Sequence, residues 1–219
     1  MRSRNRPSTG DARRCGRAEV VHLASAALPA QRVPNVGRDG TVTDQTPLTT
    51  LDARYSEDRA EATPWPEAVV LLEQAALFWV SSVRPDRRPH VTPVVAVWMS
   101  GALYFSSGPE EQKSRNLAAN RSCAVTTGCN TWDEGFDIVL HGEVEIVRDV
   151  ALLQKVADAF LAKYGNDWSF EVGADGTFRG PGVALVYQLK PTQALGFGKG
   201  SPFSHTLWDF SSLPRLGGR

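Results

Sequence analysis

The sequence has little from which a metal site or a disulfide framework could be built. Its three cysteines, Cys15, Cys123 and Cys129, form neither an even set nor a C-x-x-C pair. Unpaired thiols are typical of a reducing compartment such as the cytosol. The four histidines are scattered, and no set of them has the spacing of a zinc site. We therefore expect a cytoplasmic protein with free thiols and no bound metal.

Excess charge of one sign and long hydrophobic runs are also missing. Lys plus Arg equals Asp plus Glu at 24 each, so no basic surface for nucleic acid is indicated. No apolar run approaches the ~20 residues that a membrane-spanning helix needs. With 42% hydrophobic and 22% charged residues in 219, the composition is that of a globular protein with a core. We expect neither a nucleic acid nor a membrane as a partner.

The motifs of three common enzyme classes are absent as well. The glycines of the segment 196–200 (GFGKG) lack the G-x-G-x-x-G spacing, and the chain lacks the βαβ rhythm of a Rossmann fold. There is no P-loop and no G-x-S-x-G elbow. No pair of residues stands out as a catalytic acid and base, so we assign no catalytic residue.

What the sequence does contain is a series of strand patterns separated by close turns. They predict strands over residues 77–83, 90–99, 102–107, 122–127, 136–147 and 183–198, with a last short strand at 205–210. Helices are predicted over 64–76, in the segment after Ser107, and over 150–164, where Asp149 is the N-cap and Gly165 the stop. Gly142 in the middle of a strand indicates a bulge or sharp coil. The pattern favours a mainly β fold, a six-stranded antiparallel barrel with capping helices.

The chain divides by composition into three parts. Residues 1–46 are rich in Arg, Pro, Gly and Ser, and we expect a poorly ordered extension or an over-called start site. A secretory signal is the alternative, although Glu19 and His22 interrupt its apolar stretch. Residues 47–210 are the predicted domain, and residues 211–219 a frayed tail.

The most informative stretch is His90–Asn120. A strand over 90–99, a Ser-Gly turn and a return strand lead into Ser107-Gly-Pro-Glu110, which reads as a capping box. In that motif the Ser107 hydroxyl accepts a helix N–H and Glu110 reaches back. Hydroxyls and free N–H groups at a helix start, with Lys113 one turn further, can hold an anion such as a phosphate.

The segment Tyr104–Asn120 (YFSSGPEEQKSRNLAAN) resembles the phosphate-binding corner of the pyridoxamine 5'-phosphate oxidase-like split barrels. These are flavin- and deazaflavin-binding proteins, often small homodimers, and the resemblance extends over about residues 48–210. It implies a six-stranded split β-barrel of the FMN-binding type, with cofactor sites at the interface of a homodimer. It also implies FMN or the deazaflavin coenzyme F-420 as cofactor, and hydride transfer to a small organic substrate.

The resemblance further implies which residues bind the cofactor. Lys113 holds the phosphate, the strand at Val91–Val94 lines the ring system, and Trp132 offers a flat surface over the ring. The full set is Val91, Thr92, Pro93, Val94, Ser106, Ser107, Gln112, Lys113, Ser114, Arg115 and Trp132. Phe197, Lys199 and Trp208 lie in the C-terminal stretch that reaches the cofactor pocket in relatives.

Four positions depart from the flavin oxidases. Gln112 and His90 each stand where those enzymes often carry Arg, Asp137 stands near a Gln position, and Asp209 replaces the Arg of Trp-Arg-Phe. Gln brings no charge and no bidentate fork, and an ionised carboxylate cannot donate a hydrogen bond. The departures at Gln112 and Asp137 favour the relatives that use coenzyme F-420.

Several alternatives stay open. Arg115 contacts phosphate or pairs with Glu111, and from sequence alone Val91, Pro93 and Trp98 are core residues. The protein is an oxidoreductase, or a non-catalytic binder of a flavin-like cofactor or haem, or a cofactor-free structural dimer. The pyridoxamine phosphate oxidase reaction itself is a further alternative.

Overall fold

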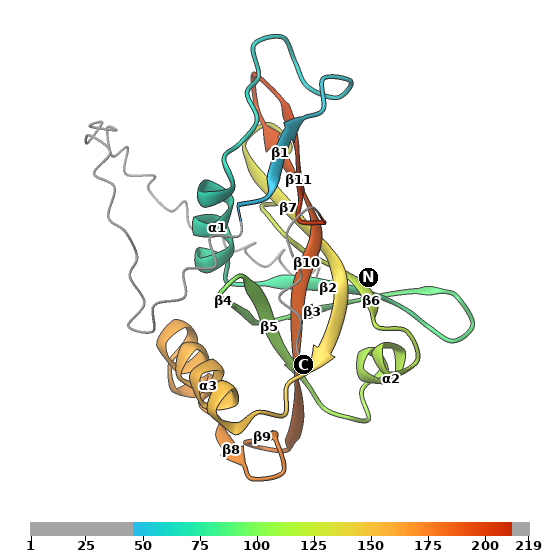
Figure 1. Cartoon of the computed structure of the whole chain (residues 1–219), viewed down its shortest axis with the longest axis vertical. Coiled ribbons are helices and arrows are strands. Elements are labelled where there is room, and N and C mark those ends of the chain that lie inside the picture. Colours follow the sequence, from blue (N-terminus) through green and yellow to red (C-terminus); the bar gives the residue numbers. More distant parts are fainter. Residues whose placement is uncertain (1–45, 212–219) are drawn as a thin grey trace, which may run out of the picture. The chain divides into compact units, whose positions relative to one another are not determined.

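A computed structural model describes residues 46–211 (Figure 1), and the predictions for residues 1–45 and 212–219 lie outside the described residues. The described chain contains eleven strands, three α-helices and one 3-10 turn. In order they are β1 (Leu48–Leu51), α1 (Trp65–Gln74), β2 (Phe78–Val83), β3 (Pro89–Val94), β4 (Ala96–Met99), β5 (Ala102–Ser107), α2 (Gln112–Ala119), β6 (Ser122–Thr127), β7 (Gly135–Ile146), α3 (Val150–Tyr164), η1 (Asn166–Trp168), β8 (Glu171–Gly173), β9 (Thr177–Arg179), β10 (Val183–Lys199) and β11 (Ser204–Asp209).

All strand pairs are antiparallel, so the predicted mainly β antiparallel fold class is confirmed. The strands follow the order β1-β11-β10-β7-β6-β2-β3, and β4–β5 and β8–β9 branch from β10. The sheet does not close, because β1 and β3 are the two ends of this order. Eleven strands are present where seven strand segments were predicted, because β1, β8 and β9 are short additional strands and the predicted 90–99 strand is two.

That division at Val95 has a clear physical cause. β3 pairs with β2, whereas β4 pairs with β5, so the chain changes partner between the two strands. At the change, Tyr164 of α3 donates its hydroxyl to the Ala96 carbonyl oxygen (2.8 Å) and accepts the Ala96 N–H (3.2 Å). Lys163 donates to the same carbonyl (3.0 Å). The end of α3 thus satisfies backbone groups that a continuous ladder would have used.

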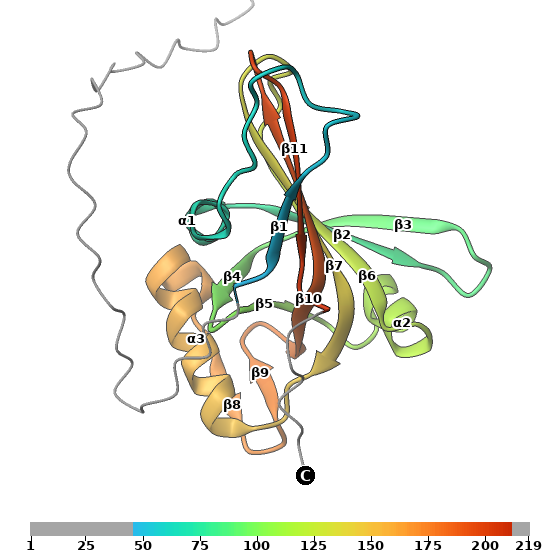
Figure 2. The same ribbon diagram turned by 45° about the horizontal axis from the view of Figure 1, so that its top comes forward.

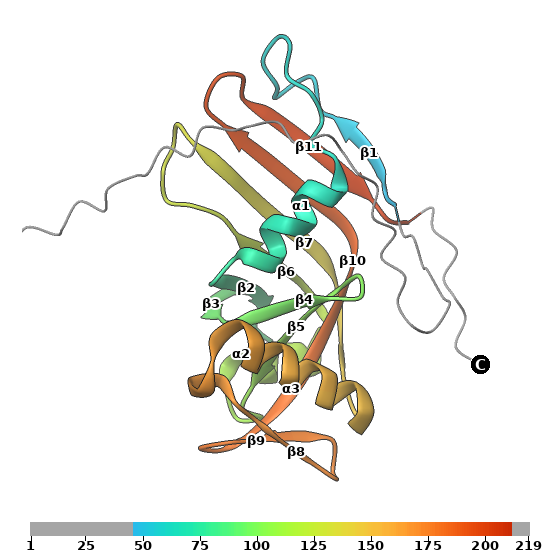
Figure 3. The same cartoon turned by 90° about the vertical axis from the view of Figure 1, so that its left-hand side faces the viewer.

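The inner face of the sheet carries the main core. One row of cross-strand neighbours crosses it, and its five central residues are buried: Trp208, Ala194, Leu140, Val125 and Val80. Helix α1 crosses in front of this face (Figure 3). Its first residue, Trp65, contacts Trp98, Trp208 and Phe210 edge-on at 4.9–5.7 Å. Trp98 is therefore a core aromatic, as one of the two sequence interpretations had it.

A second cluster lies between α3 and the β8–β9 hairpin, seen together at the bottom of Figure 3. The predicted helix 150–164 is confirmed at both ends. Asp149 accepts the N–H of Leu152 (2.7 Å), and Gly165 ends the helix with φ of +73°. The buried face of α3 is formed by Leu153, Val156, Ala157 and Phe160, whereas Leu161 is exposed.

Turns and helix α1 differ from the predictions in detail. The turn before β5 has φ of +51° and +75° at Ser100 and Gly101, which confirms the two-residue hairpin. Arg87 adopts φ of +67°, a left-handed conformation that is uncommon for residues other than Gly. The irregularity predicted at Gly142 lies opposite it, in β10 between Pro191 and Gln193. Ala76 lies outside α1 and is exposed. No helix among residues 46–211 is long and apolar enough to span a membrane.

Candidate functional site

The candidate site begins where β5 ends and α2 starts, at the right of Figures 1 and 2. The predicted capping box is wrong in its register. Helix α2 starts at Gln112 with Glu111 as N-cap, and no side chain caps it. Glu111, not Glu110, reaches back, accepting the N–H of Gly108 at Oε1 (2.7 Å). Since no side chain satisfies the first-turn N–H groups of α2, they are available to an anion.

Lys113 is buried at this helix start and forms an ion pair with Glu111. The Lys113 side chain is 9% exposed, whereas that of Glu111 is 52% exposed. Partial burial of the Glu111 carboxyl raises its pKa, but hydrogen bonds from Lys113, the Gly108 N–H and Ser107 outweigh this and the net pKa is lowered. The start of α2 therefore carries the buried positive charge of Lys113 and the solvent-exposed negative charge of Glu111.

Two serines that the sequence placed at the site meet beneath the helix start. Ser114 donates to the Ser107 hydroxyl oxygen (2.7 Å), and both side chains are buried. Ser114 also forms a hydrogen bond with Tyr187 of β10, whose pKa is raised by burial and lowered in part by this bond. The three hydroxyls connect α2 to the two strands below it.

A second polar chain connects α2 to β2. Asn116, fully buried, donates from Nδ2 to the Ser82 hydroxyl (2.9 Å) and accepts from Gln112 Nε2 (2.8 Å). Gln112 in turn accepts a long hydrogen bond from Arg84 (3.5 Å). Among the described residues, Arg84 has no carboxylate within ion-pair distance. The site predicted from sequence missed Ser82, Arg84 and Asn116, although the alternation of β2 would have placed Ser82 and Arg84 on one face.

From the alternation of β3, Val91 and Pro93 were expected to face the core. The structure instead turns the alternate residues of β3 toward the side of α2. His90 and Thr92 share the face of Ser82 and Val80, their neighbours on β2, and Val94 is buried there too. Val91 and Pro93, predicted as core residues from sequence alone, are exposed on the opposite face, Val91 at 54%. Buried atoms His90 Nδ1 and Thr92 Oγ1 have no hydrogen-bond partner in the described chain. Buried polar atoms without a hydrogen-bond partner are rare in folded proteins, and a ligand or a water molecule is expected to satisfy them.

The remaining predicted residues are not part of this cluster. Ser106 lies on the opposite face of β5 from Ser107, half-buried. Arg115 is exposed and pairs with Glu110 (2.8 Å) instead of Glu111, and its contact with a phosphate stays a prediction. Trp132, in the loop between β6 and β7, is 77% exposed.

Three other aromatic and charged residues lie elsewhere. Asp137 accepts from Lys199 Nζ (2.9 Å), and Lys199 also donates to the Cys129 carbonyl (2.7 Å). Trp208 is fully buried and donates its indole N–H to the Thr63 carbonyl (3.0 Å). Lys199 lies at the tip of the β10–β11 hairpin, which both Figures 1 and 2 place far from α2. Within residues 46–211, no group of His, Cys, Asp and Glu could hold a metal ion.

Comparison with known proteins agrees with this architecture. A sequence model of the family described as pyridoxamine 5'-phosphate oxidase matches residues 64–194, more than half of the chain. None of the curated proteins compared with the chain matches it.

Solved structures with the same fold include a putative 5-nitroimidazole antibiotic resistance protein from Bacteroides thetaiotaomicron VPI-5482. It is 18% identical over 73% of this chain and 90% of that one, with a TM-score of 0.50. A haem binding protein from Mycobacterium smegmatis is 14% identical over 64% of this chain and 55% of that one, with a TM-score of 0.52. An F-420 reductase is 27% identical over 57% of this chain and 93% of that one, but its TM-score of 0.43 supports no functional argument. The family match and the shared antiparallel fold together confirm the predicted resemblance, and the chain belongs to the pyridoxamine 5'-phosphate oxidase-like split-barrel family.

Proposed function

We propose that the protein is an oxidoreductase that binds FMN or coenzyme F-420 at the start of α2 and acts as a homodimer on a small organic substrate. The observation that carries the proposal is the buried Lys113 at an uncapped helix start, beside polar atoms of β3 that have no partner. Membership of the family supports a flavin-like cofactor.

The residues at the corner fit the phosphate of such a cofactor. The first N–H groups of α2 and the ammonium of Lys113 favour a dianion through both hydrogen bonds and the helix dipole. The orphaned His90 Nδ1 and Thr92 Oγ1 lie on the α2 side of β3, so they can take polar groups of the same ligand. Bound there, FMN or F-420 would supply the hydride chemistry, while these side chains supply position and charge.

The ion pair with Glu111 makes it possible to distinguish a phosphate-binding role of Lys113 from a purely structural one. A phosphate and the Glu111 carboxylate compete for the same ammonium, and like charges at one site disfavour each other. Because Glu111 is half exposed, its side chain can turn into water when an anion arrives. Removing its charge should therefore strengthen cofactor binding, and removing the charge of Lys113 should weaken it.

The test is a fluorescence titration of the purified protein with FMN and, separately, with F-420. We expect Lys113→Met to raise the Kd at least tenfold, about 1.4 kcal/mol, and Glu111→Gln to lower it. Lys155→Met, an exposed lysine on α3, is the matched control and should change nothing. Binding of neither cofactor, or equal affinity in all four proteins, would refute the proposed corner.

The homodimer is supported by the outer face of the sheet. A single row of cross-strand neighbours crosses all seven strands there, with no charged residue and none fully buried: Thr50, Leu207, Leu195, Val139, Thr126, Trp79 and Pro93. Val91, on the same face, continues the apolar surface. An uncharged row that crosses the whole sheet is more apolar than single scattered residues require, and a second copy would bury it.

Molar mass by light scattering tests this part. We expect a dimer, and Val91→Asp should shift it to monomer because the new carboxylate would lie in the interface. Val70→Asp places the same change on an equally exposed position of α1 and should leave the mass unchanged. A monomeric wild-type protein, or two variants that behave alike, would contradict the dimer.

A turnover assay distinguishes an oxidoreductase from a non-catalytic cofactor-binding protein. Oxidation of the reduced cofactor by an organic acceptor is expected for the oxidoreductase, whereas tight binding without turnover would identify a cofactor-binding protein. Conversion of pyridoxamine phosphate would identify the family's namesake reaction.

A further inference from the structure

Arg84 directly follows β2 and begins the turn to β3. Its N–H donates to the Arg88 carbonyl (2.9 Å), and its own carbonyl accepts the Arg87 N–H (2.8 Å). The alternation of β2 puts the Arg84 side chain on the face of Ser82, which is the face toward α2. The β2–β3 hairpin extends beside α2 at the right of Figures 1 and 2. The turn therefore fixes the base of this side chain next to the helix start.

The guanidinium of Arg84 is partly buried but has few partners. Within residues 46–211 its one hydrogen bond goes to Gln112 Oε1, and 3.5 Å is long for such a bond. Asp86, the acid of the same turn, is bound by Arg88 instead (2.6 and 2.8 Å). Because a guanidinium has five N–H donors, most of those of Arg84 remain for a ligand or for water.

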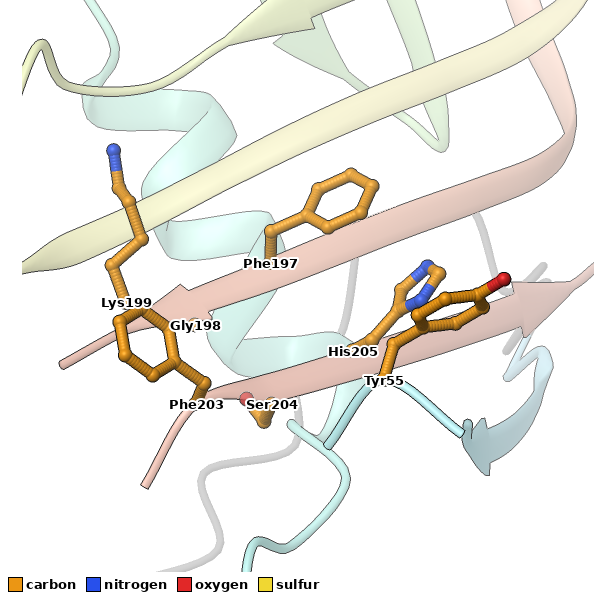
Figure 4. Close-up of a pocket in the computed structure, with 7 residues that line it drawn as sticks. All are labelled: Tyr55, Phe197, Gly198, Lys199, Phe203, Ser204 and His205. Carbon is orange, nitrogen blue, oxygen red and sulfur yellow. The ribbon is translucent and has the colours of Figure 1, made fainter. Parts of the chain in front are cut away.

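Lys199 shows how the same chain neutralises another partly buried cation. Its side chain is 12% exposed, and its ammonium donates to Asp137 (2.9 Å) and to the Cys129 carbonyl (2.7 Å). Figure 4 shows this ammonium pointing away from the rings of Tyr55 and His205. Arg84 has no such acid among the described residues. A charge withdrawn from water without a partner is costly, so an anion bound beside Arg84 would stabilise it.

Gln112 holds the guanidinium in place but cannot itself neutralise an anion. Its Nε2 donates to Asn116 Oδ1 (2.8 Å), and Asn116 Nδ2 donates to the Ser82 hydroxyl (2.9 Å). This order of donors and acceptors turns Gln112 Oε1 toward Arg84. Gln112 is therefore a positioning residue, and the charge beside it belongs to Arg84.

The charges at the start of α2 call for a second cation. Lys113 is paired with Glu111, so the pair is neutral as a whole. A phosphate monoester carries a charge of about −1.5 to −2 at pH 7. The N-terminus of a helix contributes only about +0.5. Arg84, in contact with the residue before Lys113, adds a full positive charge that no acid of the described chain pairs with.

We propose that Arg84 is the second phosphate-binding residue of the cofactor site, with its guanidinium positioned by Gln112. A guanidinium donates two parallel N–H bonds to a phosphate, which are stronger than its long contact with Gln112. The inference rests on the proposed function, and it assigns the uncompensated positive charge of the site to a residue of β2 rather than of α2.

The test compares each cofactor with its phosphate-free form, by fluorescence titration of the full-length protein. Riboflavin is the counterpart of FMN, and the deazariboflavin chromophore is that of F-420. The ratio of the two affinities cancels the contribution of the ring system, so a general loosening of the fold leaves it unchanged. We expect Arg84→Met to reduce the preference for the phosphorylated form at least fivefold. Arg87→Met removes an exposed charge of the same turn and should leave the preference within about twofold.

A double variant tests whether the charge itself matters. Arg84→Gln with Gln112→Arg moves the guanidinium from β2 to α2 and should restore the wild-type preference, whereas a purely structural role of Arg84 predicts no rescue. A preference that Lys113→Met loses and Arg84→Met keeps would overturn this inference and leave the proposed function standing. A loss in Arg84→Met without rescue would overturn it too. Binding of neither cofactor would refute the inference and the proposed function together.

Discussion

The buried amide of Asn116 should be the strongest single polar connection between α2 and the sheet. It bonds to the Ser82 hydroxyl of β2 and to Gln112 of its own helix, with no exposure to water. Asn116→Ala removes the hydrogen bond that Ser82 accepts and the one that Gln112 donates, and the buried Ser82 hydroxyl keeps only its long bond to the His90 carbonyl (3.4 Å). We expect this variant to be destabilised although Ala is the better helix former.

The magnitude follows from two opposing contributions. Leaving buried polar partners unsatisfied costs about 1–3 kcal/mol. Replacing Asn by Ala inside a helix recovers up to roughly 0.7 kcal/mol. The net loss in the free energy of unfolding is therefore about 1–2 kcal/mol. Most of it should be shared with Ser82, because each side chain is the other's partner.

A double-mutant cycle with Ser82→Ala, followed by urea unfolding, measures that shared part. We expect a coupling energy of at least about 0.5 kcal/mol, as for contacting residues in one network. The exposed pair Gln154–Asp158 on α3 has a similar amide–oxygen bond (2.9 Å) and serves as control. Its coupling should stay within about 0.2–0.5 kcal/mol. Additive losses at Asn116 and Ser82 would refute the reasoning.

Three further predictions concern pH, packing and thiol reactivity. Burial lowers the pKa of Lys163 from 10.5 to about 8, so the unfolded chain binds more protons between these values and stability from this group rises with pH there. The wild-type free energy of unfolding measured against that of Lys163→Met should therefore increase from pH 8 to pH 10, and a flat difference would contradict it. Gly142→Ala places a Cβ 2.7 Å from a carbonyl oxygen of β10 and should cost about 1–3 kcal/mol in chemical denaturation, whereas Gly182→Ala, with no atom within 4 Å, should be near neutral. The exposed Cys129 has a pKa that is lowered chiefly by a hydrogen bond with the Thr131 hydroxyl, whereas burial raises the pKa of Cys123 to about 12. A disulfide reagent at neutral pH should label the first much faster than the second, and equal rates would contradict this.

Sequence reasoning succeeded where one segment decides its own structure. The helix 150–164, with Asp149 and Gly165 at its ends, and the strand 122–127 have the predicted bounds, because caps and alternation are local signals. The Ser100-Gly101 turn was predictable for the same reason. The family, and with it the fold class, followed from the local motif at Tyr104–Asn120.

Sequence reasoning failed where contacts with a distant segment determine the local structure. The alternation of residues 90–99 could not reveal the break at Val95, because the cause is Tyr164 at the end of α3. Periodicity fixed that Val91 and Thr92 face opposite ways, but not which of them faces α2. The choice between Glu110 and Glu111 as the residue that reaches back depends on where the helix starts, and α2 starts at Gln112 rather than directly after Ser107.

Helix α2 contributes both to the stability of the fold and to the proposed cofactor site. Stability and cofactor binding are therefore expected to depend on each other. Asn116 and Ser114 attach α2 to β2 and β5, and Lys113 directly precedes Ser114 on the same helix. A loosened attachment would therefore displace Lys113 and the first N–H groups of α2 together. Asn116→Ala should then weaken cofactor binding although Asn116 itself need not touch the ligand. Unaltered affinity in that variant, with its stability reduced, would show that the phosphate is held elsewhere than at the start of α2.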